Sequence, residues 1–316
     1  MEETQLRQQV TALRDRVDEV VLGQQGLVTG MVVALLTPGH VLLEGAPGTA
    51  KTLLVRALAA GLGVPTARIQ FTPDLMPGDI TGSPIYNEAT RAFEFRPGPI
   101  FTSLLLADEI NRTPPKTQSA LLEAMAEGRV TVDGTSYPLP EVFLVAATAN
   151  PIEYEGTYTL PEAQLDRFFV KLPVATPARE VEAEVVGAHL AGFDPAALDL
   201  GPAVTSGEAI VQARGAVGQV SVDPAVTAYC VDIAAFTRTA SGVRLGASPR
   251  GSIDLAKGAR AWAWLRGSTF VTPDDVKALA PIVLTHRISL RPEAELDGVT
   301  QQSVVSAALA NVPVPR

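Results

Sequence analysis

The sequence predicts an α/β fold: a five-stranded parallel sheet flanked by helices, followed by a smaller, all-α domain. Five short segments spaced along residues 1–174 are expected to be strands, and the apolar ones among them do not alternate with polar residues, as expected for strands covered by helices on both faces. After about residue 174 such segments stop, and alanine-rich stretches with helical periodicity replace them. We therefore expect two domains, residues 1–174 and residues 175–316.

The elements of the first domain follow from their apolar patterns. Two helices are expected first, at residues 5–20 and 24–36, because apolar residues recur there at helical spacing. The first strand, Val41 to Leu43, leads into a glycine-rich loop and a helix from Thr52 to Ala60. A further helix is expected within residues 114–128, and the other strands at 68–71, 104–108, 142–148 and 168–172.

Two insertions between these elements are expected to form β-hairpins. Residues 84–97 alternate on both sides of a polar turn, and residues 129–138 contain Asp133 and Gly134, a strong signal for a two-residue turn. In the second domain no strand is predicted. Helices are expected near 179–191, 224–239, 249–266 and 273–285.

Composition narrows the class of protein. The formal net charge is -9 and the pI is about 5.0, which disfavours strong nonspecific binding to nucleic acid. The single cysteine can form no intrachain disulfide, as is usual in a reducing compartment. No signal peptide is recognised, and no apolar stretch approaches the roughly 20 residues of a membrane helix. We expect a cytoplasmic protein without a membrane span.

The segment GAPGTAKT, residues 45–52, nearly matches the phosphate-binding pattern G-x-x-x-x-G-K-[ST]. Its strand–loop–helix context is the one this pattern requires, although a structural glycine-rich turn is the alternative reading. Lys51 would reach the β- and γ-phosphates and the Thr52 hydroxyl would bind Mg²⁺. The loop expected to wrap the phosphates consists of Gly45, Ala46, Pro47, Gly48, Thr49 and Ala50.

Ala50 is the one departure from that pattern, where a glycine is usual. If this position takes a left-handed backbone, alanine costs roughly 1–2 kcal/mol. Each charge-assisted hydrogen bond to phosphate contributes about 1.5–3 kcal/mol. Ala50 is therefore expected to strain the loop without abolishing phosphate binding.

Polar residues end two further apolar strands. Asp108 and Glu109 end one, where one carboxylate can hold the hydration shell of Mg²⁺ and the other can polarise an attacking water. Asn150 ends the next, where its amide could orient that water and contact the γ-phosphate. Alternatively, Asn150 forms a turn before Pro151.

Two arginines are candidates for stabilising charge on a transferred phosphoryl group, a role that raises turnover by about 10³–10⁵. Arg167 precedes the last strand, and Arg250 lies at the expected start of a helix in the second domain. A lone arginine is more often part of a surface or interdomain salt bridge. For His286 and Arg287 the sequence indicates no chemistry beyond helix capping or an interface contact.

Taken together in order, four segments resemble the MoxR family of AAA+ ATPases over residues 5–290. They are GAPGTAKT, LLLADEINRTPPKTQSALLEAMAEG, ATANPIEYEGTYTLPEAQLDRFF and SPRGSIDLAKGARAWA. The family pattern itself has alanine before the lysine, so Ala50 is no departure within it. The resemblance implies a P-loop AAA+ core with a helical lid domain.

The resemblance also implies roles within one nucleotide site. Lys51 and Thr52 would form the Walker A pair, and Asp108 and Glu109 the Walker B metal carboxylate and catalytic base. Asn150 would be sensor 1. The backbone from Val21 to Gly23 would contact the adenine.

Other roles implied by the resemblance concern assembly. Arg167 would be an arginine finger donated to the neighbouring subunit, with Arg112 and Lys116 as alternative interface cations. Arg250 would be sensor 2, which links the lid to the nucleotide. The two hairpin insertions would face the pore of a ring, most simply a hexamer.

The function implied is that of an ATP- and Mg²⁺-dependent, chaperone-like ATPase that remodels or matures a client protein, often with a partner carrying a von Willebrand factor A domain. No residue of the sequence identifies the client protein. One alternative is a nucleic-acid motor of the helicase-related branch, which predicts basic hairpins, whereas the two hairpins here are of mixed charge. Another is a small-molecule kinase or nucleotide switch, which would not need Arg250 on a helical lid.

Overall fold

The computed structural model describes residues 2–45, 50–149, 158–198 and 200–315, and within them it has the predicted five-stranded parallel sheet. The strand order is β2-β5-β8-β1-β9, so the first strand of the sheet in sequence is paired on both sides. The carboxyl ends of neighbouring parallel strands meet at one edge, where open α/β sheets bind ligands. The strands are β1 (Val41–Glu44), β2 (Thr66–Gln70), β5 (Leu104–Asp108), β8 (Leu144–Ala149) and β9 (Val170–Pro173).

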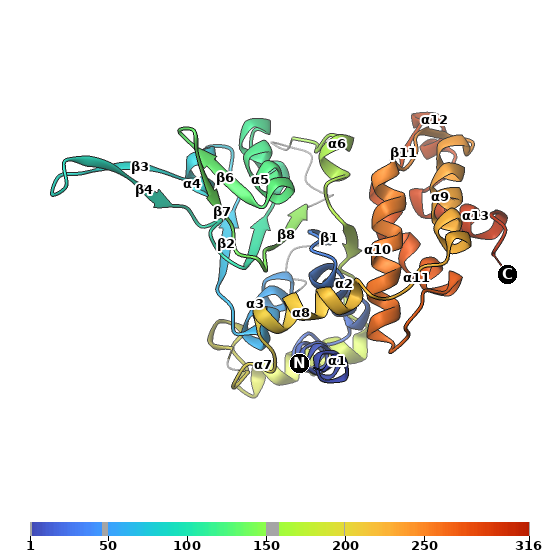
Figure 1. Cartoon of the computed structure of the whole chain (residues 1–316), viewed down its shortest axis with the longest axis horizontal. Coiled ribbons are helices and arrows are strands. Elements are labelled where there is room, and N and C mark those ends of the chain that lie inside the picture. Colours follow the sequence, from blue (N-terminus) through green and yellow to red (C-terminus); the bar gives the residue numbers. More distant parts are fainter. Residues whose placement is uncertain (1, 46–49, 150–157, 199, 316) are drawn as a thin grey trace.

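The central strands β1, β5 and β8 are buried on both faces, which explains why they do not alternate with polar residues, whereas the edge strand β2 is largely exposed. Leu43 and neighbouring side chains of the same face join the core formed with α1 (Glu3–Asp18), α2 (Gln25–Leu36) and α3 (Lys51–Leu62). Leu42 and its neighbours on the opposite face pack with α4 (Pro77–Thr81) and α5 (Pro115–Glu127). The three-layer arrangement follows directly from these two apolar clusters (Figure 1).

Both hairpins are present. β3 (Gly82–Asn87) and β4 (Ala92–Pro97) pair antiparallel and project away from the body of the molecule (Figure 1). β6 (Arg129–Val132) pairs with β7 (Thr135–Pro138) through a turn in which Asp133 and Gly134 both have positive φ, at 48° and 78°. Phe95 stacks on Tyr137 with ring centroids 4.0 Å apart, so the two hairpins contact each other at their bases.

The C-terminal region is helical, as predicted, and four of its helices lie where the periodicity places them. These are α7 (Arg179–Leu190), α9 (Pro224–Thr239), α10 (Pro249–Leu265) and α11 (Pro273–Leu284). Three more were not predicted: α8 (Gly207–Val217), α12 (Pro292–Leu296) and α13 (Gln301–Asn311).

The expectation that this region contains no strand was wrong in one detail. Val243–Leu245 (β10) and Ser289–Leu290 (β11) form a two-stranded antiparallel ladder. Segments of three and two residues are too short to carry a period-2 pattern. The remaining short elements are α6 (Glu162–Leu165), η1 (Ile110–Arg112), η2 (Pro195–Ala197) and η3 (Thr285–Arg287).

The helices α9 to α13 form a separate group beside the sheet, with α11 contacting β9 and α10 contacting α2 (Figure 1). Gly258 of α10 permits close packing on the core, because a Cβ there would lie 3.1 Å from Cζ of Phe169. By contrast, α7 lies on the far side of α3 and buries none of its side chains (Figure 1). None of the helices in the described ranges combines the length and apolar character of a membrane span.

Candidate functional site

A cavity of about 570 Å³ opens at the carboxyl edge of the sheet. Its polar wall comes from the ends of β1, β2, β5 and β8 and from the start of α3. Its opposite wall comes from the segment after α1 and from α7 and the residues that follow it. Among the predicted site residues, the cavity brings together Gly45, Ala50, Lys51, Thr52, Asp108 and Glu109.

The N-terminus of α3 forms the base of this cavity. Ala50 is its N-cap and has the left-handed backbone considered above, with φ 59° and ψ 14°. Among the described residues no side chain caps this end of the helix, so its N–H groups and its positive dipole end are directed at the cavity. Ala46, Pro47, Gly48 and Thr49 lie outside the described residues.

Gly45 is required by close packing where β1 ends. A Cβ at this position would lie 2.5 Å from the carbonyl oxygen of Val174, so no larger residue fits without moving the chain. The Lys51 ammonium donates a hydrogen bond of 2.8 Å to the Gly45 carbonyl and so lies across the start of the loop. Partial burial lowers the pKa of Lys51, while the carboxylates of Asp108 and Glu109 act to raise it.

Asp108 is buried at the end of β5 and bonded on both carboxylate oxygens. Thr148 of β8 donates its hydroxyl to Oδ1 at 2.9 Å, and Arg68 of β2 donates Nε to Oδ2 at 2.8 Å. The same Thr148 hydroxyl accepts the backbone N–H of Glu109 at 2.8 Å. Thr148 thereby fixes both acidic residues relative to β8.

Glu109 begins the turn into η1 with a left-handed backbone, φ 57° and ψ 48°. Such a conformation is uncommon for a non-glycine residue and is found repeatedly at functional sites. Its carboxylate accepts a hydrogen bond of 2.7 Å from Gln70 and pairs with Arg112 at 3.2 Å. The predicted alternative interface cation, Arg112, therefore contacts the acidic pair of its own chain, whereas Lys116 is exposed at the start of α5.

The far end of the cavity is mostly apolar, although Glu19 and His189 also line the cavity. Val20 and Leu22 line it from one side, and Val185 and Phe193 line it from the other. Within the predicted adenine-contacting segment, Val21 itself is buried in the core and contributes no lining. The cavity is thus polar at the α3 end and apolar at the α7 end, which suits a ligand with a charged and a flat apolar part.

The tight turn after Val21 depends on Gly23. It has φ 71°, and a Cβ on it would lie 2.9 Å from Val181 of α7. Next to it, Gln24 donates a hydrogen bond of 2.7 Å to the Ala175 carbonyl. These contacts hold the segment before α2 against the chain that leads into α7.

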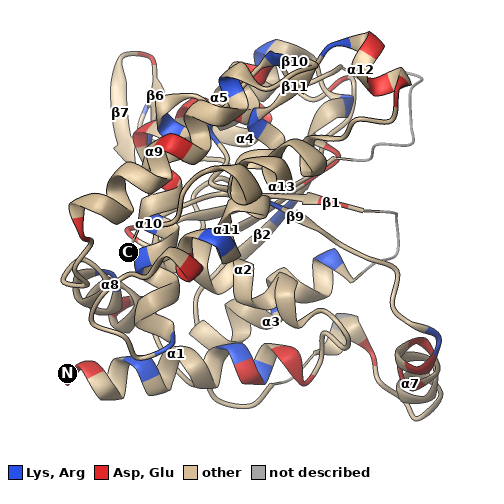
Figure 2. Ribbon diagram, turned by 90° about the vertical axis from the view of Figure 1, so that its right-hand side faces the viewer, with Lys and Arg blue, Asp and Glu red and all other residues tan. Residues whose placement is uncertain are grey.

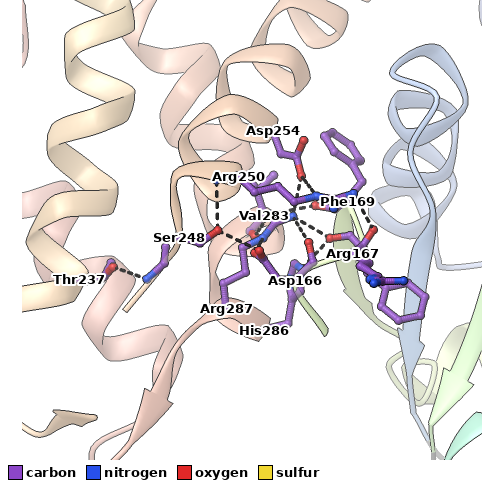
Figure 3. Close-up of polar contacts among 12 residues, drawn as sticks. Asp166, Arg167, Phe169, Thr237, Ser248, Arg250, Asp254, Val283, His286 and Arg287 are labelled. Atoms are coloured by element: carbon purple, nitrogen blue, oxygen red, sulfur yellow. Dashed lines mark hydrogen bonds and ion pairs between the residues drawn. The ribbon is translucent and has the colours of Figure 1, made fainter. Parts of the chain in front are cut away.

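The two predicted arginines do not line the cavity. Asn150 lies outside the described residues. Arg167 is half-buried and donates a hydrogen bond of 2.9 Å to the Leu122 carbonyl in α5. Arg250 lies beside it and approaches the Arg167 carbonyl at 3.5 Å (Figure 3). Neither arginine lines the cavity of its own chain.

The sequence did not indicate Thr148, Arg68 or Gln70 as site residues. Gln70 is the register partner of Asp108 across the β2–β5 pair, and Arg68 lies two residues before it on β2. This position follows from the strand order, which the sequence does not state. For Thr148 a signal was available, since it is the polar residue two positions before Asn150 in an otherwise apolar strand.

The residues present fit a magnesium-bound polyphosphate. A helix N-terminus and a lysine suit phosphate, and a buried aspartate with the Thr52 hydroxyl in the same cavity suits Mg²⁺, which usually keeps several waters and takes few protein ligands. The described ranges hold no group of three or more His, Cys, Asp or Glu side chains placed to bind a metal. The fold and the site define a nucleotide-binding protein of the P-loop class.

Comparisons with known proteins identify the family within that class. Residues 40–170 match the model of the ATPase family associated with various cellular activities (AAA), and residues 235–308 match that of the AAA lid domain. Chaperone MoxR1 of Mycobacterium tuberculosis is 41% identical over 95% of this chain and 81% of its own length. The uncharacterized protein YeaC of Bacillus subtilis is 48% identical over 95% of this chain and 93% of its own.

A solved structure agrees with the sequence matches. A crystal structure of a protein from Cytophaga hutchinsonii superposes with a TM-score of 0.92 at 38% identity, covering 99% of this chain and 97% of that one. The chain belongs to the MoxR family of AAA+ ATPases.

Proposed function

We propose that this protein hydrolyses ATP with Mg²⁺ at the cavity beside α3, and that hydrolysis drives a chaperone-like activity on a client protein. One observation supports the proposal most strongly. The Lys51 ammonium, the N-terminus of α3 and the Asp108–Glu109 pair line a single cavity, with Thr148 tying the Asp108 carboxylate and the Glu109 backbone N–H to the neighbouring strand. That is the set of groups phosphoryl transfer to water requires.

Each residue then has a defined part. The loop from Gly45 to Ala50 and the start of α3 hold the phosphates, and Lys51 neutralises charge between them. Thr52 and Asp108 would hold Mg²⁺, which would shield the phosphate charge. Glu109 accepts the proton of the attacking water, and Asn150 orients that water. The apolar end of the cavity, between Leu22 and Phe193, takes the adenine.

For Mg²⁺ to bind Asp108, Arg68 must either move away or share the Asp108 carboxylate with the metal. Its Oδ2 is paired with Arg68 at 2.7–2.8 Å in this structure. The pair is exposed on the arginine side, where the side chain is 55% accessible, so it contributes little stability and can be exchanged readily. Arg68 is free to turn toward a phosphate when the carboxylate takes up the metal.

Arg167 and Arg250 act on a neighbouring subunit under this proposal. Neither arginine lines the cavity of its own chain. The two lie next to each other, Arg167 just after α6 and Arg250 at the start of α10. An arginine that completes the site from outside makes hydrolysis dependent on assembly, and a closed ring, most simply a hexamer, gives every subunit the same neighbour. Residues 1–174 would serve as the nucleotide-binding domain and residues 175–316 as the lid.

The name of MoxR1 supports a chaperone-like activity, and a partner with a von Willebrand factor A domain remains part of the proposal. A nucleic-acid motor is disfavoured, because the projecting β3–β4 hairpin carries Glu88 and Glu94 as well as Arg91 and Arg96. Elsewhere, basic and acidic residues are interspersed over the elements seen in Figure 2 instead of forming one basic face.

The experiment that tests the proposal measures phosphate release against protein concentration. We expect specific activity to rise steeply as the protein assembles, and to be lost at all concentrations in the Arg167→Ala variant. Specific activity that stays constant down to the monomer would show that a single chain holds a complete site, and would refute the role of Arg167 across the interface.

A further inference from the structure

The segment that carries Arg167 is bonded to the lid on both sides of that residue. Arg287 of η3 donates Nε to Oδ1 of Asp166 at 2.9 Å, and Nη2 to the Phe168 carbonyl at 2.8 Å. Its Nη1 also approaches the Phe169 carbonyl at 3.4 Å. Asp166, Phe168 and Phe169 enclose Arg167 in the chain, so these bonds fix the backbone from which the Arg167 side chain extends (Figure 3).

Arg287 is itself held rigidly. Its side chain is 1% exposed, and it pairs with Asp254 of α10 at 2.6 Å and donates to the Val283 carbonyl at 2.7 Å. With Asp166 and the Phe168 and Phe169 carbonyls, these acceptors occupy every N–H direction of the guanidinium. A planar guanidinium with all its N–H groups bonded fixes its partners relative to one another better than a flexible lysine ammonium would.

Neighbouring lid residues reinforce the same contact. Ser248, the N-cap of α10, donates its hydroxyl to Oδ2 of Asp166 at 2.9 Å, and the His286 ring bonds the Phe168 carbonyl at 3.0 Å. Burial and the nearby Arg287 charge hold the pKa of His286 well below its usual value, so its ring is neutral and donates through Nε2. Arg244 of β10 pairs with Glu162 at the start of α6.

Stability alone is a poor explanation for this arrangement. A buried ion pair is often no more stabilising than well-packed apolar residues, because both charges lose their hydration. Burial accordingly raises the pKa of Asp254 and lowers that of Arg287, each against the influence of its partner. What the cluster does provide is one defined geometry for residues 166–169 relative to the lid.

We propose that Arg287 is a positioning residue: through Asp166 and the Phe168 carbonyl it fixes the lid of one subunit to the segment carrying Arg167, and so sets that arginine for the site of the neighbouring subunit. The proposal rests on the function proposed above. It follows that lid and arginine finger move as one unit, and that a change in the lid of one subunit alters turnover in the next.

Mixed assemblies test this directly. A donor subunit with Glu109→Gln cannot hydrolyse ATP but supplies Arg167; an acceptor subunit with Arg167→Ala has an intact base but supplies no finger. Each alone should be inactive, and their mixture should regain phosphate release. If the mixture stays inactive while both variants bind ATP, the role of Arg167 across the interface is wrong, and the positioning proposal falls with it.

Arg287→Lys is then placed in one partner at a time. In the donor it should lower the activity of the mixture by about 10–100-fold, the effect of displacing a reacting group by about 1 Å. In the acceptor it should change activity less than about twofold, because Arg167 is already absent there and no finger remains to be displaced. Equal losses in both placements, or no loss in the donor, would overturn the proposal.

Two further variants separate positioning from folding. Asp254→Asn keeps the volume of the lid carboxylate and one acceptor oxygen, and should show the same donor-only loss in smaller degree if Arg287→Lys unfolds. Arg214→Lys is the control, since Arg214 is a partly buried arginine that bridges α8 to the Leu35 and Glu141 carbonyls, both remote in sequence from residues 166–169. It should show no dependence on placement; a donor-only loss there would also overturn the proposal.

Discussion

Ala50 offers a prediction whose sign differs from that of an ordinary alanine-to-glycine change. Its φ of 59° lies in the left-handed region, where an L-residue with a Cβ is disfavoured by roughly 1–2 kcal/mol. Glycine removes this penalty, but it also makes the unfolded chain more flexible, which lowers the free energy of unfolding by about 0.4–1 kcal/mol. Ala50→Gly should therefore raise the free energy of unfolding by about 0.5–1 kcal/mol.

The matched control is Ala228→Gly, at an exposed position within α9. The unfolded-state term is the same for both substitutions, but Ala228 has ordinary helical backbone. Glycine there should lower the free energy of unfolding by about 1 kcal/mol. The opposite signs of the two changes would isolate the contribution of the left-handed backbone in the native state.

The assay is equilibrium unfolding in denaturant without nucleotide, together with titration of Mg²⁺-ATP into each variant. We expect the Ala50→Gly variant to bind ATP about as tightly as the parent, because the N–H groups of the loop are retained. Destabilisation by Ala50→Gly equal to that of Ala228→Gly would refute the reasoning, since it would mean that Ala50 carries no conformational strain.

Three further predictions follow from single contacts. Lys51→Ala should weaken ATP binding by about 10–100-fold, the value of a charge-assisted hydrogen bond, whereas Lys277→Ala on the exposed face of α11 should leave calorimetric affinity unchanged. Thr148→Val removes the hydroxyl shared by Asp108 and Glu109; turnover should fall at least tenfold with little change in ATP affinity, and unchanged kcat would contradict the bridge. Burial lowers the pKa of His40 to about 4 from an unfolded value of 6.5, so protonation favours the unfolded chain. The contribution of the neutral His40 ring to stability is therefore complete above pH 6.5 and is lost as pH falls toward 4. The free energy of unfolding should be about 2 kcal/mol lower at pH 5 than at pH 8 for this reason, and a His40→Gln variant with the same pH dependence as the parent would exclude His40 as the source.

Much of the fold could be predicted because burial leaves a direct mark on sequence. The central strands of the sheet are buried on both faces, so segments such as Leu104–Asp108 appear as apolar runs. The helix α8 was missed although Ser206 caps it by accepting the Ala209 N–H, a signal that the sequence carries. The ladder of β10 and β11 is held by its neighbours, and nothing within so few residues specifies it.

The candidate site divides in the same way. Lys51 and Asp108 could be predicted because each belongs to a recognisable motif: Lys51 follows an apolar strand and a glycine-rich loop, and Asp108 ends an apolar strand. The contacts of Asp108 with Arg68 and Thr148 could not, since both partners are 40 residues away and meet it only through strand order. Arg287 bonds Asp166 across 121 residues, which is why the sequence indicated no role for it.

The central claim is that the cavity beside α3 binds Mg²⁺-ATP. Isothermal titration of Mg²⁺-ATP into the Glu109→Gln variant tests it most directly, because binding is then measured without turnover. The account predicts one saturable site per chain, with the heat greatly reduced when Lys51→Ala is added. A folded Glu109→Gln protein that gives no binding heat with Mg²⁺-ATP at millimolar concentration would contradict it.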